Sequence, residues 1–198
     1  MARTETKKNL DRAQEIYLTA AQLFVERGMD STSVADIADR LKMTKAGLYY
    51  YFTSKQELLY QIVTLGLDSV KDEVLDPARK IKNAEQRLEF IILNHARLAA
   101  EGNHAVIIVS HEMNALSFKQ REAMLERRRE YFEFVRGTLV ELKTEGKLRD
   151  IDITTATFTL FGMILWLPRW FRPTGKLSVK KVCQDVCAMA LKGLLRSH

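Results

Sequence analysis

The stretch "TKAGLYYYFTSKQELL", residues 44–59, carries the residue types best suited to holding an anionic partner. It places Tyr49, Tyr50, Tyr51 and Phe52 in a row. In a helix, successive residues point about 100° apart, so four consecutive rings cannot share one buried face. Leu48, Tyr51 and Phe52 are spaced to pack inward together. The residues left for an outer, polar face are Thr44, Lys45, Gly47, Tyr49 and Tyr50.

That outer face has the chemistry of a DNA contact. A tyrosine ring packs on sugar and on the thymine methyl group, while its hydroxyl bonds a phosphate. Gly47 costs up to about 1 kcal/mol of helix propensity and would let the backbone approach a duplex closely. Lys55 and Ser33 open neighbouring helices, where side chain and backbone amides can together bind a phosphate. A half-buried tyrosine is common in any protein, so the spacing, caps and flanking lysines carry the prediction as a set.

Helical periodicity dominates the chain and predicts an all-α fold. Near the N-terminus a helix over about 8–27 ends at Gly28, Ser33 caps a short helix, and Thr44 caps a third. "SKQE" at 54–57 is a capping box that opens a helix to about Leu75, which Pro77 closes. Helix, short helix, three-residue break and short helix is the layout of a helix-turn-helix DNA reader. Further helices are predicted at 84–101, 103–114, 118–145, 153–171 and 179–196, with N-cap signals at Ser117 and Ser178.

The segment "VADIADRLKMTKAGLYYYFTSKQELL" resembles the N-terminal signature of TetR-type bacterial transcriptional regulators over its whole length. It departs from the common pattern at Tyr51, where many members have histidine, and at Thr44, where serine is usual. Arg3, Lys7 and Lys8 are interpreted as a flexible basic arm that reaches the flanking groove. The resemblance implies these DNA contacts: Ser33, Thr44, Lys45, Gly47, Tyr49, Tyr50 and Lys55.

Downstream, "WLPRWFRPTGKLS" interleaves arginines with aromatic rings. Two readings are open. Arginines near a helix C-terminus favour the helix dipole while the rings fill the core. Alternatively, Arg169 and Arg172 bind the phosphates of a ligand and an indole stacks on its base. Pro168 predicts that the helix kinks or ends there.

A second resemblance bears on this choice. With "HEMNAL" and the long helix before it, this stretch is similar to effector domains of TetR-type regulators of fatty-acid, sterol or aromatic breakdown, which often respond to acyl-CoA thioesters. The resemblance implies an acyl pocket that includes Met113 and Met163. The residues nearer the CoA end would be Trp166, Arg169, Trp170 and Arg172.

An apolar stripe on the last helix has the spacing of a helix–helix seam. With the 153–171 helix it predicts a four-helix bundle with a second copy, and hence a homodimer on a palindromic operator. Cys183 and Cys187 are expected to be reduced, buried residues within this stripe. The stripe consists of Val179, Val182, Cys183, Val186, Cys187, Ala190 and Leu194.

Enzymatic and metal functions find little support. His95, His104 and His111 lack a convincing ligand spacing, so packing is favoured over metal binding. The sequence has no nucleophile elbow, phosphate-binding glycine loop, dinucleotide motif or paired-histidine zinc motif, and neither catalysis nor a cofactor is expected. The net charge of +6 fits an anionic partner without locating it.

Together these patterns predict a DNA-binding domain over 1–55 and an effector-binding, dimerising domain over 56–198. Without a signal peptide or a long apolar run, the protein is expected in the cytoplasm and not in a membrane. The predicted function is a homodimeric repressor released from its operator by a small molecule, with an acyl-CoA thioester as the candidate. A regulator of drug or efflux genes with a hydrophobic effector, and a DNA-binding protein without an effector, remain as alternatives.

Overall fold

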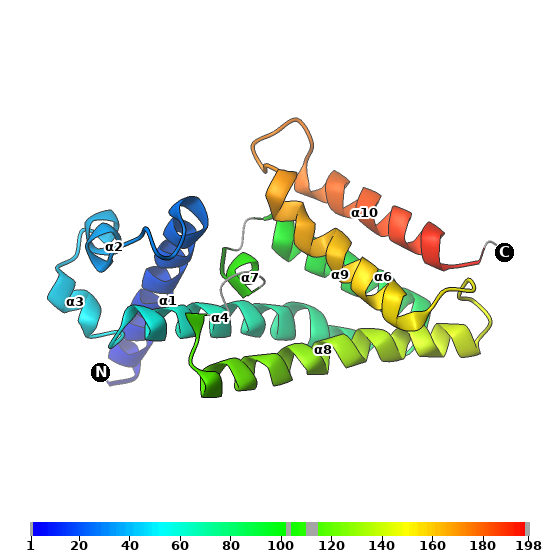
Figure 1. Cartoon of the computed structure of the whole chain (residues 1–198), viewed down its shortest axis with the longest axis horizontal. Helices are drawn as coiled ribbons and strands as arrows, with labels where there is room; N and C mark the ends of the chain where they lie inside the picture. The colour runs from blue at the N-terminus through cyan, green and yellow to red at the C-terminus, as the bar shows by residue number, and fades with distance from the viewer. Residues whose placement is uncertain (1, 102–103, 110–114, 197–198) are drawn as a thin grey trace. The chain divides into compact units, whose positions relative to one another are not determined.

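The helices of the computed structural model follow the sequence pattern closely (Figure 1). The structure describes residues 2–101, 104–109 and 115–196, and the side chains of these except residues 2–8, 104 and 109. The predicted all-α fold is confirmed. The elements are α1 (Ala2–Arg27), α2 (Val34–Leu41), α3 (Lys45–Tyr49), α4 (Lys55–Val70), a π-helical turn η1 (Lys71–Leu75), α5 (Asp76–Ala78), α6 (Ala84–Ala100), α7 (His104–Val109), α8 (Phe118–Thr144), α9 (Ile153–Trp170) and α10 (Val179–Leu194).

Side-chain caps set the helix starts where the sequence placed them. Ser33, Thr44 and Ser178 each accept a hydrogen bond from a backbone amide of the first helical turn. At the other end of α1, Gly28 has φ +85° and its amide bonds Phe24 O at 2.9 Å. A glycine is favoured there because left-handed φ strains residues that carry a Cβ atom.

The prediction that Pro77 closes the fourth helix is wrong. The helix continues through η1 into α5, and Pro77 lies in the first turn of α5. Proline has no amide hydrogen, and its ring clashes with the carbonyl four residues earlier, so a regular α-turn cannot pass this point. The amide of Asp76 instead bonds Lys71 O, five residues back, which widens the turn. The π-turn therefore absorbs the proline.

Pro168 likewise does not end its helix. The ninth helix runs on to Trp170, and the amide of Phe171 bonds Leu167 O at 2.9 Å.

The chain folds into two compact units, and the division falls within α4 and within α8. The first unit comprises Met1–Gly66 and His104–Met124, and the second comprises Leu67–Asn103 and Leu125–His198. In the first, α2 packs on α1 and α3, and α7 also packs on α1. In the second, α6 packs on both α9 and α10 (Figure 1).

The stripe on the last helix has a different partner from the predicted one. It forms a helix–helix seam, but the seam is with α6 of the same chain, and Cys187 Sγ lies 3.9 Å from Glu89 O. The buried members of the stripe are Val182, Cys183, Cys187, Ala190 and Leu194. These side chains are therefore not available to a second copy.

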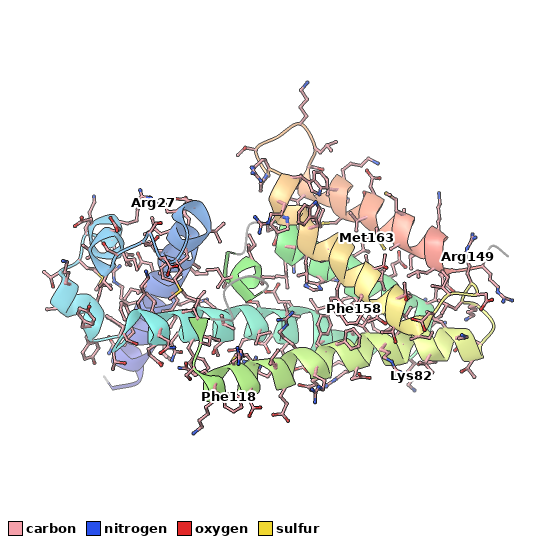
Figure 2. All side chains as sticks on the ribbon, viewed as in Figure 1. Arg27, Lys82, Phe118, Arg149, Phe158 and Met163 are labelled. Carbon is pink, nitrogen blue, oxygen red and sulfur yellow. The ribbon has the colours of Figure 1, made fainter. Side chains whose placement is uncertain are left out.

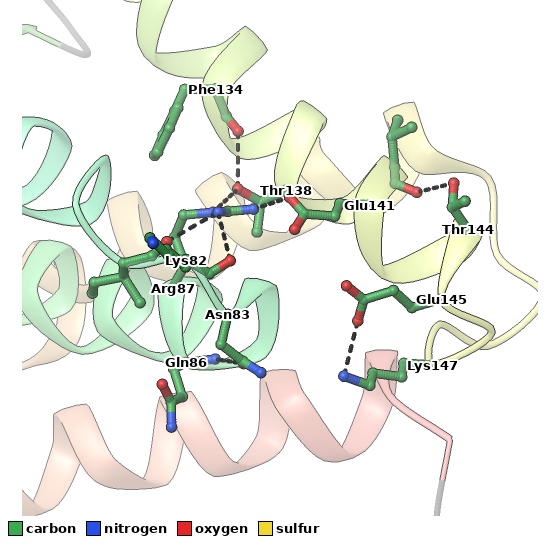
Figure 3. A network of polar contacts seen from close by, with 12 residues as sticks. Lys82, Asn83, Gln86, Arg87, Phe134, Thr138, Glu141, Thr144, Glu145 and Lys147 are labelled. Carbon is green, nitrogen blue, oxygen red and sulfur yellow. Dashed lines mark hydrogen bonds and ion pairs between the residues drawn. The ribbon is translucent and has the colours of Figure 1, made fainter.

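A guanidinium holds α6 to α8 in the second unit (Figure 3). The side chain of Arg87 is only 12% exposed. It donates to Thr138 Oγ1 and to Ile81 O, both at 3.0 Å, and pairs with Glu141. Its charge also lies 5.9 Å from the centre of the Phe134 ring. The Arg87 side chain thus binds a backbone carbonyl in the loop before α6 and two polar side chains of α8.

Replacing Arg87 with methionine is expected to lower the free energy of unfolding by about 2–3 kcal/mol, because it leaves polar partners without a donor at a mostly buried site. Urea unfolding followed by circular dichroism measures this loss. The matched control is Arg136→Met, which breaks an exposed pair with Glu133 in the same helix and should cost below about 1 kcal/mol. Equal losses for the two variants would contradict the assigned role.

A buried histidine lies in an aromatic cluster of α6, α8 and α9. His95 Nδ1 is 3.2 Å from the hydroxyl of Tyr131, and the Phe161 ring centre lies within 6.0 Å of both rings. Burial lowers the pKa of His95 to about 4 and raises the pKa of Tyr131. The imidazole is therefore neutral in the folded protein at pH 7, which agrees with the packing role favoured from the sequence.

This histidine makes stability depend on pH. Its folded pKa lies below the usual 6.5, so acid protonates the unfolded chain first and stability falls as the pH drops from about 6.5 to 4. The loss that His95 adds should reach about 3 kcal/mol at pH 4. Comparing wild type with His95→Gln, which keeps a partner for Tyr131, isolates this contribution from that of the carboxylates. Parallel stability–pH curves for the two proteins would show that His95 does not titrate as described.

Candidate nucleic-acid interface

The third helix presents aromatic rings outward from a buried anchor. Leu48 is fully buried and Phe52 is 3% exposed, whereas Tyr49 is 51% and Tyr50 75% exposed. Tyr51 is half-buried and meets the Tyr50 ring edge-on, with ring centres 5.1 Å apart. The predicted division is confirmed for the inward Leu48 and Phe52 and for the outward Tyr49 and Tyr50. The predicted inward packing of Tyr51 is met only in part, because this ring is half-buried.

The polar residues around α3 are also open. Thr44 and Lys45 are exposed at its start. Lys55, in the first turn of α4, is half-buried, and its ammonium group lies 5.9 Å from the centre of the Phe24 ring. This cation–π contact holds the ammonium group of Lys55 near the Phe24 ring.

The structure gives a local reason for glycine at position 47, which the sequence did not reveal. A Cβ atom at this position would lie 3.2 Å from Thr44 Oγ1, the oxygen that accepts the Gly47 amide at 3.1 Å and caps α3. Glycine thus leaves room for the cap. Close approach of the backbone to DNA stays a prediction for this residue.

Ser33 is exposed but already engaged. Its hydroxyl lies 2.5 Å from Asp36 Oδ2, its amide donates to the same oxygen, and its Oγ accepts the Asp36 amide. These hydrogen bonds hold the pKa of Asp36 below its usual value. A phosphate contact through Ser33 would have to compete with this carboxylate, a partner that the S-x-x-D spacing signals as a capping box.

The proposed effector residues cluster at the end of α9. Trp166 is 63% and Trp170 52% exposed, and the Arg169 guanidinium lies 6.0 Å from the Trp166 ring centre. Arg172 donates to Pro168 O and Phe171 O, which caps the helix end. The two indoles therefore do not fill the core, whereas Phe171 is buried in it and Arg172 serves the helix terminus. Met163 is half-buried on the same helix (Figure 2). Met113 lies outside the described residues, as do His111 and the predicted helix end at 110–114.

Sequence reasoning missed an open apolar face on α9. Phe158 is 62% exposed, Gly162 is exposed with nothing within 4 Å of a Cβ atom built on it, and Trp166 follows one turn later. Their four-residue spacing puts all three on one side of the helix. That spacing is visible in the sequence, but periodicity alone does not show that this face stays exposed.

Cysteine and metal chemistry remain without support. Burial raises the pKa of the Cys187 thiol to about 11 and also raises that of Cys183, so both thiols are poor nucleophiles. Within the described ranges, no group of three or more His, Cys, Asp or Glu residues is placed to hold a metal ion. In the same part of the chain, no helix is both long and apolar enough to cross a membrane.

Comparison with known proteins covers both parts of the chain. Residues 16–62 match the profile of bacterial regulatory proteins of the tetR family, and residues 82–194 match the tetracyclin repressor-like C-terminal domain. The HTH-type transcriptional repressor KstR2 of Rhodococcus jostii is 29% identical over 197 residues, which cover 98% of this chain and 96% of KstR2.

Two solved structures share the whole architecture. AibR, in complex with isovaleryl coenzyme A and operator DNA, is 32% identical with a TM-score of 0.83, and the match covers 90% of this chain and 97% of AibR. The ketosteroid transcriptional regulator KstR2 of Mycobacterium tuberculosis is 26% identical with a TM-score of 0.86, covering 94% and 96%.

Proposed function

This chain belongs to the tetR family of bacterial regulatory proteins, and we propose that it is a homodimeric repressor that an acyl-CoA thioester releases from a palindromic operator. Members of this family are transcriptional regulators and not enzymes, which confirms the prediction that this protein is not an enzyme. The observation that carries the proposal is the exposure of Tyr49 and Tyr50 on a helix anchored by Leu48. It gives α3 the polar, protruding face that major-groove reading requires.

DNA contact is assigned to the residues that surround this face. Lys45 and Lys55 supply positive charge for phosphates, and the two phenols reach sugar, phosphate and base edges. Thr44, Gly47 and Ser33 complete the proposed contact set, with Ser33 the weakest because Asp36 occupies it.

Lysine contacts of this kind have a salt signature. Replacing Lys45 with alanine should weaken operator binding about equally for all sequences and reduce the slope of log K against log salt by about 1 for each reading head. Fluorescence anisotropy over a series of salt concentrations measures the slope. Lys143→Ala, an exposed lysine in the last turn of α8, serves as the control and should leave the slope unchanged. An unaltered slope for Lys45→Ala would remove Lys45 from the interface.

The acyl-CoA assignment has two supports. AibR was solved with isovaleryl coenzyme A bound, and this chain aligns with it over nine-tenths of its length. In addition, two exposed indoles and two arginines meet at the end of α9, the combination that suits an adenine ring and phosphates. Trp166, Arg169, Trp170 and Arg172 are therefore proposed to bind the CoA end, with Met163 and Met113 toward the acyl chain.

The dimer is proposed to use the last two helices, but through their open faces. On α9 these are Phe158 and Gly162, and on α10 Met189 is 67% exposed. Large apolar side chains at this exposure on neighbouring helices are typical of a surface that a partner covers. A two-fold interface would then place two copies of α3 for successive major grooves of a palindrome.

A mobility-shift experiment tests the proposal as a whole. The purified protein is mixed with the DNA upstream of its own gene, alone or with isovaleryl-CoA, free CoA or isovalerate. The expected result is a shifted band that disappears when isovaleryl-CoA is added and persists with free CoA or isovalerate. A band that resists all three additions favours a regulator with a different hydrophobic effector or with none. Absence of any band on this DNA would contradict the repressor assignment.

A further inference from the structure

Two helix starts that are far apart in sequence meet in the first compact unit. The side-chain amide of Gln56, in the first turn of α4, donates from Nε2 to Ala115 O at 2.9 Å, and the two residues are 59 positions apart in the sequence. Next to it, the side-chain amide of Gln120, in the first turn of α8, donates from Nε2 to Glu57 Oε2 at 3.3 Å, across 63 positions of sequence. All four residues belong to the unit that contains α1, α2 and α3.

Each partner is itself held by its own helix cap. The Glu57 amide donates to Ser54 Oγ at 3.1 Å, and its second carboxylate oxygen accepts Gln61 Nε2 at 2.7 Å. Across from it, Gln120 Oε1 accepts the Ser117 amide at 3.2 Å in a capping box. Glu57 and Gln120 are both half-buried. Their mutual hydrogen bond thus joins two preorganised helix ends, not two free side chains.

This pair of hydrogen bonds lies beside the residues that position α3. The turn of α4 that it fixes also carries Lys55, and Phe52, three residues before, anchors the tyrosine run from behind. A small displacement of this turn would move the lysine and the base of α3 relative to a duplex. Because docking a helix in the major groove tolerates little misplacement, the hydrogen bond has leverage on operator affinity.

We propose that Glu57 and Gln120 are positioning residues for operator binding: their hydrogen bond ties the first turn of α4 to the start of α8 and so holds the reading helix in register. The proposal rests on the proposed function of α3 as the DNA reader.

A charge-swap experiment tests the hydrogen bond. Gln120→Glu keeps an acceptor for the capping box of α8 but sets two carboxylates against each other, and it should lower affinity for the upstream DNA about three- to tenfold. Combining it with Glu57→Gln exchanges donor and acceptor and should restore affinity to within about twofold of wild type. Glu57→Gln alone preserves an amide donor opposite an amide acceptor and should change little. Such a pattern is the non-additivity expected of residues in contact.

Separate measurements keep the outcomes distinct. Melting temperature and circular dichroism are recorded for each variant, because a positioning role predicts that affinity changes while the fold is kept. Gln56→Ala, at an exposed position, provides a second probe and should also reduce affinity. The inference is overturned if wild type shifts DNA while Gln120→Glu and Gln56→Ala bind equally well, or if the swap fails to restore binding. A wild-type protein that shifts no DNA contradicts the proposed function instead.

Discussion

Replacing Tyr49 with alanine is expected to weaken operator binding by about thirtyfold or more without unfolding the protein. The ring is half-exposed on α3, so its removal takes away a groove contact and little core area. Losing one such contact costs about 1–3 kcal/mol per reading head, and a dimer loses two. Titrating labelled upstream DNA by fluorescence anisotropy measures the change.

Two further variants make this result specific. Tyr49→Phe keeps the ring and its packing against Phe52, at 5.9 Å between ring centres, so it reports the hydroxyl alone and should lose only part of the affinity. Leu18→Ala removes an exposed apolar side chain of α1, which is 40% exposed, and should leave binding unchanged. Binding by Tyr49→Ala within twofold of wild type would remove this face from the DNA interface.

Placing arginine at Gly162 is expected to convert the dimer into monomers and to reduce operator affinity more than a hundredfold. The position is exposed on α9 between Phe158 and Trp166, and a Cβ atom built there has nothing within 4 Å in the protomer. A charged side chain in the centre of an apolar interface is costly to desolvate. Monomers lose the gain from holding two reading heads on one palindrome. Light scattering after size exclusion gives the mass, and anisotropy gives the affinity.

A matched control is available in the same unit. Gly137 is also an exposed helical glycine with nothing within 4 Å of a Cβ atom, but it lies on α8. Gly137→Arg therefore introduces the same charge and the same gain in helix propensity outside the proposed interface, and should remain dimeric. A dimeric Gly162→Arg would show that α9 does not form the interface through this face.

Interactions within one helical turn were sufficient to predict most features of the helix-turn-helix segment. The caps at Ser33, Thr44 and Ser54 bind amides within three residues, so their chemistry is visible in the sequence. On α3 itself, the inward Leu48 and the outward Tyr49 follow from the angle between successive helical residues. These features need no knowledge of what the helix packs against.

Residues whose partners are distant in sequence were harder to predict. The stripe on α10 was correctly identified as a seam, but the sequence does not say whether a seam faces the same chain or another copy. Pro77 signalled a break, yet the helix passes it through a π-turn and ends at Ala78. Arg87 reads as one arginine among many, and only the fold brings Thr138 and Glu141 to it across more than fifty residues.

The sequence by itself determined an all-helical chain, its caps and the outward phenols, because each depends on backbone periodicity or on neighbours within one helical turn. The tertiary structure alone decided which face of α9 stays open, where the α10 stripe packs and that the starts of α4 and α8 share a hydrogen bond. Burial and long-range hydrogen bonds depend on which surfaces meet, and periodicity gives the face of a helix but not its partner.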